Sequence, residues 1–75
     1  MTYHQQTLSR LIHQRRKELK INQEELAELT QIALRSIRDL EKGIGNPSIK
    51  TIEKVMDVLG IELHYRLKNT TIPVE

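Results

Sequence analysis

The sequence predicts an all-α fold of four to five helices with one β-strand at its C-terminal end. Up to Gly60, apolar residues recur every three or four positions, which is the spacing of one face of a helix. Asn22 and Ser48, which are residues that begin helices, and Gly43, which ends them, divide this region into segments. After Gly60 the apolar spacing changes to every second residue, which is typical of a strand with one buried face.

The 75 residues are enough for one small domain. We expect a helical domain at residues 1–60, a strand at 61–68 and a polar, flexible tail at 69–75. The absence of cysteine excludes disulfides and thiolate metal sites, and the net charge of +2 permits nucleic-acid binding without demanding it. Because the sequence contains neither a membrane-spanning apolar run nor a secretory signal, we expect a soluble cytoplasmic protein.

The first two helices are predicted at residues 5–20 and 23–30. Asn22 is suited to begin the second helix, and Glu25, three positions later, completes a capping-box pair with it. In the first helix, neither glycine nor proline interrupts the apolar positions. These positions are Leu8, Leu11, Ile12 and Leu19.

A break separates the second helix from a third at residues 33–42, which ends at Gly43. After a loop at residues 44–47, Ser48 caps a fourth helix that ends at Gly60. The apolar positions of the fourth helix are Ile49, Ile52, Met56 and Leu59.

Residues 23–42 thus form two short helices joined by a tight turn. Such helices cross closely only where a small side chain lies at the crossing, and Ala27 occupies that place. Apolar side chains then fix the angle between the helices. They are Leu26, Ile32, Ile37 and Leu40. One face of the later helix is left free to enter a DNA major groove, which is the plan of a helix-turn-helix.

Three segments, NQEELAEL at 22–29, IRDLEKG at 37–43 and NPS at 46–48, resemble the Cro/repressor (Xre-type) helix-turn-helix family in order and spacing. The resemblance covers about residues 8–60 and implies a repressor-like domain that binds DNA. Two positions depart from the family. Gln31 stands where the family usually has a glycine in a left-handed turn, and Ala33 stands where it often has a capping serine or threonine.

Arg35, Arg38 and Lys42 share one face of the third predicted helix, opposite its apolar face. On an isolated helix such a stripe is more often a solvated surface, but family members touch bases from these positions, so the resemblance favours DNA. The expected base contacts are Leu34, Arg35, Arg38 and Asp39. The expected phosphate contacts are Gln23, Ser36, Lys42 and Asn46. For Asp39 two roles stay open, because it can accept from cytosine or orient a neighbouring arginine.

Arg16 projects from the apolar face of the first predicted helix, and Glu41 projects from the inner face of the third. Either charge would be costly to bury alone, and family members pair an arginine with a glutamate at these positions. We therefore expect Arg16 and Glu41 to form a structural ion pair. Arg15 and Lys17 leave the helix in other directions, toward DNA backbone or solvent, and of these two we expect solvent.

The predicted strand needs a neighbour for its backbone groups, and the sequence contains no second strand-like segment. The same strand from a second copy would satisfy this need in an antiparallel homodimer. The dimer residues are then Ile61, Leu63, Tyr65 and Leu67. Such a dimer places the two DNA-contacting helices about one DNA turn apart, which suits a palindromic operator on double-stranded DNA.

Helices followed by Gly-Ile-Glu-Leu-His-Tyr-Arg-Leu also resemble the HipB-type antitoxins, whose C-terminal strands pair across a dimer. This resemblance implies a transcriptional repressor of its own operon that binds a HipA-type kinase toxin in a type II toxin–antitoxin module. The alternative is a stand-alone prophage-type repressor or restriction–modification controller protein. A third hypothesis, a protein-interaction module without DNA binding, is disfavoured by Gln23, Arg35 and Arg38.

An enzyme is not expected. His4, His13 and His64 are scattered over a terminus, a helix and a strand, without metal-ligand spacing. The sequence also lacks a glycine-rich phosphate loop and a nucleophile elbow. We therefore expect neither a catalytic residue, a cofactor nor a metal.

Overall fold

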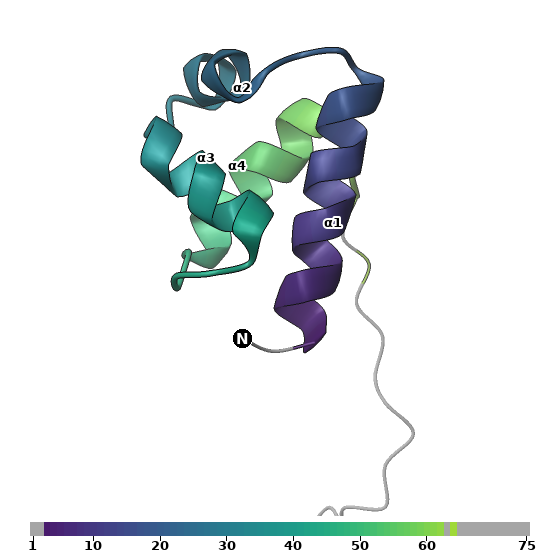
Figure 1. Ribbon diagram of the computed structural model, residues 1–75, viewed down its shortest axis with the longest axis vertical. Helices are drawn as coiled ribbons and strands as arrows, with labels where there is room; N and C mark the ends of the chain where they lie inside the picture. The colour runs from purple at the N-terminus through teal and green to yellow at the C-terminus, as the bar shows by residue number, and fades with distance from the viewer. Residues whose placement is uncertain (1–2, 63, 65–75) are drawn as a thin grey trace, which may run out of the picture.

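The computed structural model describes residues 3–62 and 64. Its regular elements are four helices, drawn in Figure 1: α1 (Tyr3–Glu18), α2 (Gln23–Thr30), α3 (Leu34–Lys42) and α4 (Ile49–Leu59). The all-α prediction is confirmed for this part of the chain, and the bounds of α2 are as predicted. Within the described residues, every helix is too short or too polar to span a bilayer.

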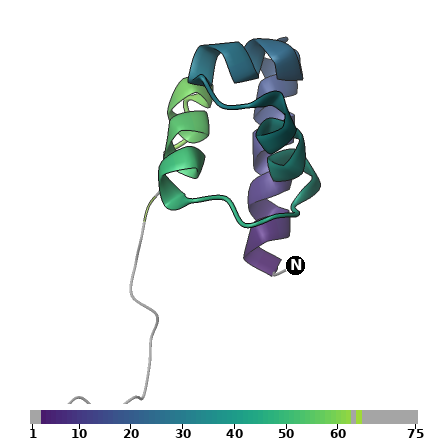
Figure 2. The same ribbon diagram turned by 90° about the vertical axis from the view of Figure 1, so that its left-hand side faces the viewer.

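The four helices enclose one core. α1 packs against α3 and α4, and α2 packs against the same two helices. Figures 1 and 2 show α2 lying across the end of the molecule at which α1 finishes. Each helix contributes at least one fully buried side chain. These are Ile12, Leu26, Ile37, Val55 and Leu59. Because α3 meets both α1 and α2, its orientation is fixed from two sides.

The predicted crossing of α2 and α3 is observed. Leu26 and Ile37 are fully buried, Leu40 is nearly so, and Ala27 and Ile32 pack against them as partly buried residues. The small Ala27 side chain lets the two helices approach. Since full burial of a leucine or isoleucine side chain stabilises a fold by about 1.5–3 kcal/mol, Leu26, Ile37 and Leu40 contribute most to holding α3 against α2.

Three apolar positions expected in the helical faces are instead exposed: Leu11 by 43%, Leu19 by 40% and Ile49 by 67%. α1 ends at Glu18, two residues earlier than predicted, because the backbone turns into the left-handed region at Lys20. Leu19 therefore lies outside the helix. Ile49 is the first residue of α4 and projects from the bundle. Leu11 lies at the edge of the buried face of α1.

Polar caps fix the beginnings of two helices. The Asn22 side chain accepts a hydrogen bond from the Glu25 backbone N–H at 2.7 Å, and the Asn22 N–H donates to Glu25 Oε1 at 2.9 Å. This reciprocal capping box starts α2 as predicted. The Ser48 hydroxyl accepts from the Thr51 N–H at 3.1 Å and starts α4.

The turn between α2 and α3 contains both departures from the family pattern. Gln31 has φ 58° and ψ 31°, which is the left-handed region that disfavours a side chain with a Cβ. Ala33 stands at the N-cap of α3 without a side-chain hydrogen bond, so α3 begins at Leu34, one residue later than predicted. At the other end, Gly43 takes the left-handed conformation at φ 72° without that cost.

The chain beyond α4 is described only in part. Ile61 is partly buried against the core, and neither Ile61 nor Glu62 has regular secondary structure. Of the four residues predicted to form the dimer strand, Leu63, Tyr65 and Leu67 lie outside the described residues, as does the predicted tail at 69–75. The strand and its pairing across a homodimer therefore stay predictions.

Candidate nucleic-acid interface

α3 presents a cationic stripe on the side opposite the core. Arg35, Arg38 and Lys42 are all exposed, whereas Ile37 and Leu40 on the other side of the same helix are buried. The helix is therefore amphipathic with its positive charges facing outward. A protein that binds DNA needs cations at its surface on a rigid element, and this stripe meets both conditions.

The other expected base contacts lie at the margins of this stripe. Leu34, at the start of α3, is half-buried, and Asp39 is half-buried on the side of the loop after α3. Leu34 keeps part of its apolar surface accessible at the end of the helix that would enter a groove first. The Asp39 side chain lies beside the loop residue Gly45. A Cβ added at Gly45 would lie 3.8 Å from Asp39 Oδ2.

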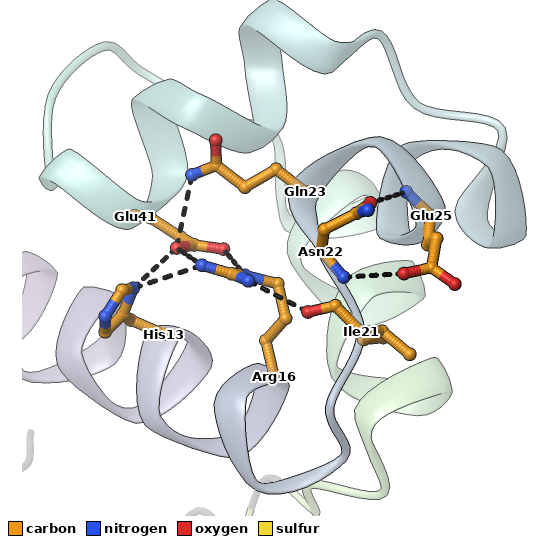
Figure 3. A network of polar contacts seen from close by, with 7 residues as sticks. All are labelled: His13, Arg16, Ile21, Asn22, Gln23, Glu25 and Glu41. Carbon is orange, nitrogen blue, oxygen red and sulfur yellow. Dashed lines mark hydrogen bonds and ion pairs between the residues drawn. The ribbon is translucent and has the colours of Figure 1, made fainter.

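Along one flank of the stripe, Arg16 and Glu41 form a bidentate ion pair (Figure 3). Arg16 Nε donates to Glu41 Oε2 at 2.6 Å, and Arg16 Nη2 donates to Glu41 Oε1 at 2.9 Å. The remaining arm, Nη1, donates to the carbonyl oxygen of Ile21 at 2.9 Å. Only 9% of the Arg16 side chain and 4% of the Glu41 side chain are exposed. The guanidinium thus ties α1 both to α3 and to the loop before α2.

Two further side chains converge on the same carboxylate. His13 Nδ1 lies 2.7 Å from Glu41 Oε1, and Gln23 Nε2 donates to that oxygen at 3.3 Å. Figure 3 shows the two approaching Glu41 from α1 and α2. Gln23, expected as a phosphate contact, therefore also contacts the buried network through one amide hydrogen, and its amide retains a second donor hydrogen. The contact of His13 with Glu41 was not predicted from the sequence.

The network sets the charge state of Glu41. Burial raises the pKa of the Glu41 carboxyl, but hydrogen bonds from Arg16, His13 and Gln23, with the charge of Arg16, together outweigh burial and hold that pKa below its ordinary value. The hydrogen bond with Glu41 raises the pKa of the Arg16 guanidinium, and burial opposes this more weakly. The pair is therefore ionised at neutral pH and contributes no net charge to the surface.

On the opposite flank, a hollow of about 150 Å³ lies between α3 and the loop that follows it. It is lined by Ser36, Asp39, Leu40, Ile44, Gly45, Asn46 and Pro47. Two expected phosphate contacts, Ser36 and Asn46, are exposed here. Of the other two, Gln23 lies on the flank with the Arg16–Glu41 network, and Lys42 lies in the stripe. The expected DNA contacts thus border the cationic stripe on both sides.

Arg15, expected to face solvent, is only partly exposed and also bonds to the core helices. Its Nε donates to the carbonyl oxygen of Leu59 at 2.8 Å, and its Nη1 lies 3.4 Å from Glu18 Oε1. Leu59 is the last residue of α4, where carbonyl groups lack partners within the helix. Arg15 therefore fastens the end of α4 to α1. The sequence gives no signal for this contact, because the two residues are 44 positions apart.

A protein-family model described as helix-turn-helix matches residues 12–66, which is most of the 75-residue chain. The chain belongs to the Xre/Cro-like helix-turn-helix family. This helix-turn-helix protein is a DNA-binding transcriptional regulator, and its family is generally non-enzymatic. No curated protein matches the chain. Within residues 3–62 and 64, no three side chains of the metal-binding types lie close enough to hold a metal ion.

Proposed function

We propose that this helix-turn-helix protein is a sequence-specific repressor that places α3 in the DNA major groove. The observation that carries the proposal is the amphipathic division of α3, with Arg35 and Arg38 exposed opposite buried Ile37 and Leu40. A helix fits the width of the major groove, and an arginine there can bind O6 and N7 of guanine together. The two arginines are about one turn apart on the exposed face of the helix, so both face the groove when α3 lies in it.

Leu34 and Asp39 extend this contact at its two ends. The accessible part of Leu34 is suited to the methyl group of thymine, and Asp39 can accept from N4 of cytosine or orient a neighbouring arginine. The two roles of Asp39 differ in the base they select. A variant Asp39→Asn would lose a cytosine preference in the first case and relax the arginine-contacted position in the second.

The major groove is bordered by two phosphate strands, and the two flanks of α3 correspond to them. Gln23, on the flank of the Arg16–Glu41 network, and Lys42, at the end of the stripe, would bind one strand, and Ser36 and Asn46 would bind the other from the loop flank. These contacts orient the helix without selecting a base sequence. Their loss therefore weakens binding to all duplexes alike.

We expect the repressor to act as a homodimer on a palindromic operator. Support comes from the alternation of Ile61, Leu63, Tyr65 and Leu67, and from the partly buried position of Ile61 at the start of this segment. A substitution on the apolar face, Leu63→Lys, should give a monomer in sedimentation equilibrium. The matched substitution His64→Lys on the other face should leave the dimer intact. A dimeric Leu63→Lys variant, or a monomeric unmodified protein, would contradict this part of the proposal.

The narrower assignment is an antitoxin that represses its own operon and binds a HipA-type kinase. It is supported by the similarity of the segment after Gly60 to the HipB-type pattern. A stand-alone repressor or controller protein shares the helices but has no toxin partner. Co-expression with a kinase encoded beside the gene distinguishes them. An antitoxin should relieve the growth arrest that the kinase causes alone, and a stand-alone regulator should not.

Selection of bound duplexes from a random library tests DNA recognition itself. The full-length protein should enrich one motif whose half-sites are repeated in inverted orientation, about 10 base pairs apart. If sequencing found no enriched motif after several rounds, sequence-specific repression would be ruled out.

A further inference from the structure

We propose that His13 is a DNA-phosphate contact whose protonated imidazole, held by Glu41, donates its Nε2–H to the phosphate strand beside Gln23. The proposal rests on the proposed function, since it requires α3 to lie in the major groove. It adds a residue that the helix-turn-helix pattern does not indicate, and it makes operator binding depend on the uptake of one proton.

The first step is the position of His13 relative to Gln23. Both side chains lie within hydrogen-bonding distance of one atom, Glu41 Oε1, at 2.7 Å from His13 Nδ1 and 3.3 Å from Gln23 Nε2. Figure 3 shows them approaching this oxygen from opposite sides, His13 from α1 and Gln23 from α2. A phosphate strand that passes over Glu41 would therefore meet the amide of Gln23 on one side of this carboxylate and the imidazole of His13 on the other.

The second step is which nitrogen carries hydrogen. Glu41 is an ionised carboxylate and can only accept, so the 2.7 Å contact requires a hydrogen on His13 Nδ1. Arg16 Nη2 also lies 3.4 Å from this nitrogen, but it has its own shorter bond of 2.9 Å to Glu41. The hydrogen on His13 Nδ1 is therefore donated to Glu41. The other ring nitrogen, Nε2, is directed away from that carboxylate.

The third step is exposure. The His13 side chain is 50% exposed, whereas that of Glu41, to which it is bonded, is only 4% exposed. The bond with Glu41 anchors the inner edge of the ring, so the outer edge with Nε2 is the part that a ligand can reach. Glu41 also follows Arg38 by three positions and precedes Lys42, so the carboxylate that anchors the ring lies at the flank of the cationic stripe.

The fourth step is charge. A neutral imidazole with hydrogen on Nδ1 turns a lone pair toward solvent at Nε2, which would repel a phosphate oxygen, so phosphate binding requires the imidazolium. The charges that face His13 are Arg16 on α1 and Glu41 on α3, which neutralise each other, and Glu24 on α2 acts on Arg16. Arg10 and Lys17 stand one turn away on α1. A protonated His13 therefore adds one positive charge that the ion pair does not cancel.

The test measures the operator affinity of the full-length protein at pH 6 and pH 8, with the duplex obtained by selection. The unmodified protein should bind more tightly at pH 6, by up to about tenfold per pH unit if one proton is taken up. His13→Gln should abolish this dependence and, at pH 6, reduce the slope of log affinity against log salt by about 1. His13→Arg, which keeps a permanent charge, should bind equally at both pH values and as tightly as the unmodified protein at pH 6.

His64→Gln is the matched control, because His64 is exposed and pairs with Glu62 outside the network. It should retain the pH dependence. Tight operator binding that is unaffected by pH and by His13→Gln would overturn the His13 proposal and leave the repressor proposal intact. Loss of the pH dependence in His64→Gln but not in His13→Gln would also overturn it. Absence of specific binding at either pH would overturn both proposals.

Discussion

Replacing Glu41 by alanine should unfold much of the protein. The substitution leaves the Arg16 guanidinium buried, with its side chain 9% exposed, and removes both of its bonds to the carboxylate. An unpaired buried charge costs about 3–5 kcal/mol. A domain of this size has a total stability of only about 3–5 kcal/mol, so most of it would be lost. At about 4 °C or more per kcal/mol, the melting temperature should fall by at least about 12 °C.

Thermal denaturation followed by circular dichroism, at one fixed protein concentration, measures this change. Glu18→Ala is the matched control, because Glu18 pairs with Arg15 at 3.4 Å on the surface and such pairs contribute at most about 1 kcal/mol. Replacing both partners by apolar residues, as Arg16→Met with Glu41→Leu, should recover most of the stability. A Glu41→Ala variant that melts within about 2 °C of the unmodified protein would refute the structural role of the pair.

The remaining predictions concern the same network and the turn between α2 and α3. The folded-state pKa of Glu41 lies below its ordinary value of 4.5. Its contribution to the free energy of unfolding is therefore complete above pH 4.5 and is lost as the pH falls through the folded-state pKa. In urea unfolding, the free energy of unfolding should consequently fall more steeply with acid in the unmodified protein than in Glu41→Gln. Ala33→Ser should supply the missing cap of α3 and raise the free energy of unfolding by about 1 kcal/mol, and an unchanged urea midpoint would contradict this. Gln31→Gly should relieve left-handed strain at φ 58° and, after the entropic cost of glycine, stabilise by about 0.5–1 kcal/mol; a lower melting temperature would show that the turn is not strained.

Local signals in the sequence predict the helices well, because a cap acts within one turn. The Asn22–Glu25 box, Ser48, Gly43 and Gly60 all stand at the ends of helices where the pattern indicates them. Hydrophobic spacing likewise identifies the crossing of α2 and α3. It is less informative at the ends of an apolar face, since the same spacing includes exposed Leu11 and Ile49. Which residue of a broad face becomes buried depends on where the neighbouring helix crosses.

Apart from the Arg16–Glu41 pair, the polar contacts between helices are the part that spacing does not predict. The bond from Arg15 to the carbonyl of Leu59 and the contact of His13 with Glu41 join residues 44 and 28 positions apart. Such contacts depend on the angle at which α1 crosses α3 and α4. A charged residue at the margin of a helix therefore has no preferred partner in the sequence alone. Gln23 illustrates the consequence, because its bond to Glu41 is invisible from its place at the start of α2.

Base recognition by the exposed face of α3 is the central claim. Its most direct test is to measure how tightly the Arg35→Ala and Arg38→Ala variants bind the selected operator and an unrelated duplex. Lys54→Ala, an exposed cation on α4, is the matched control. Each arginine substitution should weaken operator binding by about 5- to 150-fold, which corresponds to about 1–3 kcal/mol, and should relax selection at one base position. Binding to the unrelated duplex should change far less, and Lys54→Ala should leave operator affinity within about twofold. If both arginine variants bound the operator as tightly as the unmodified protein, base recognition by this face of α3 would be contradicted.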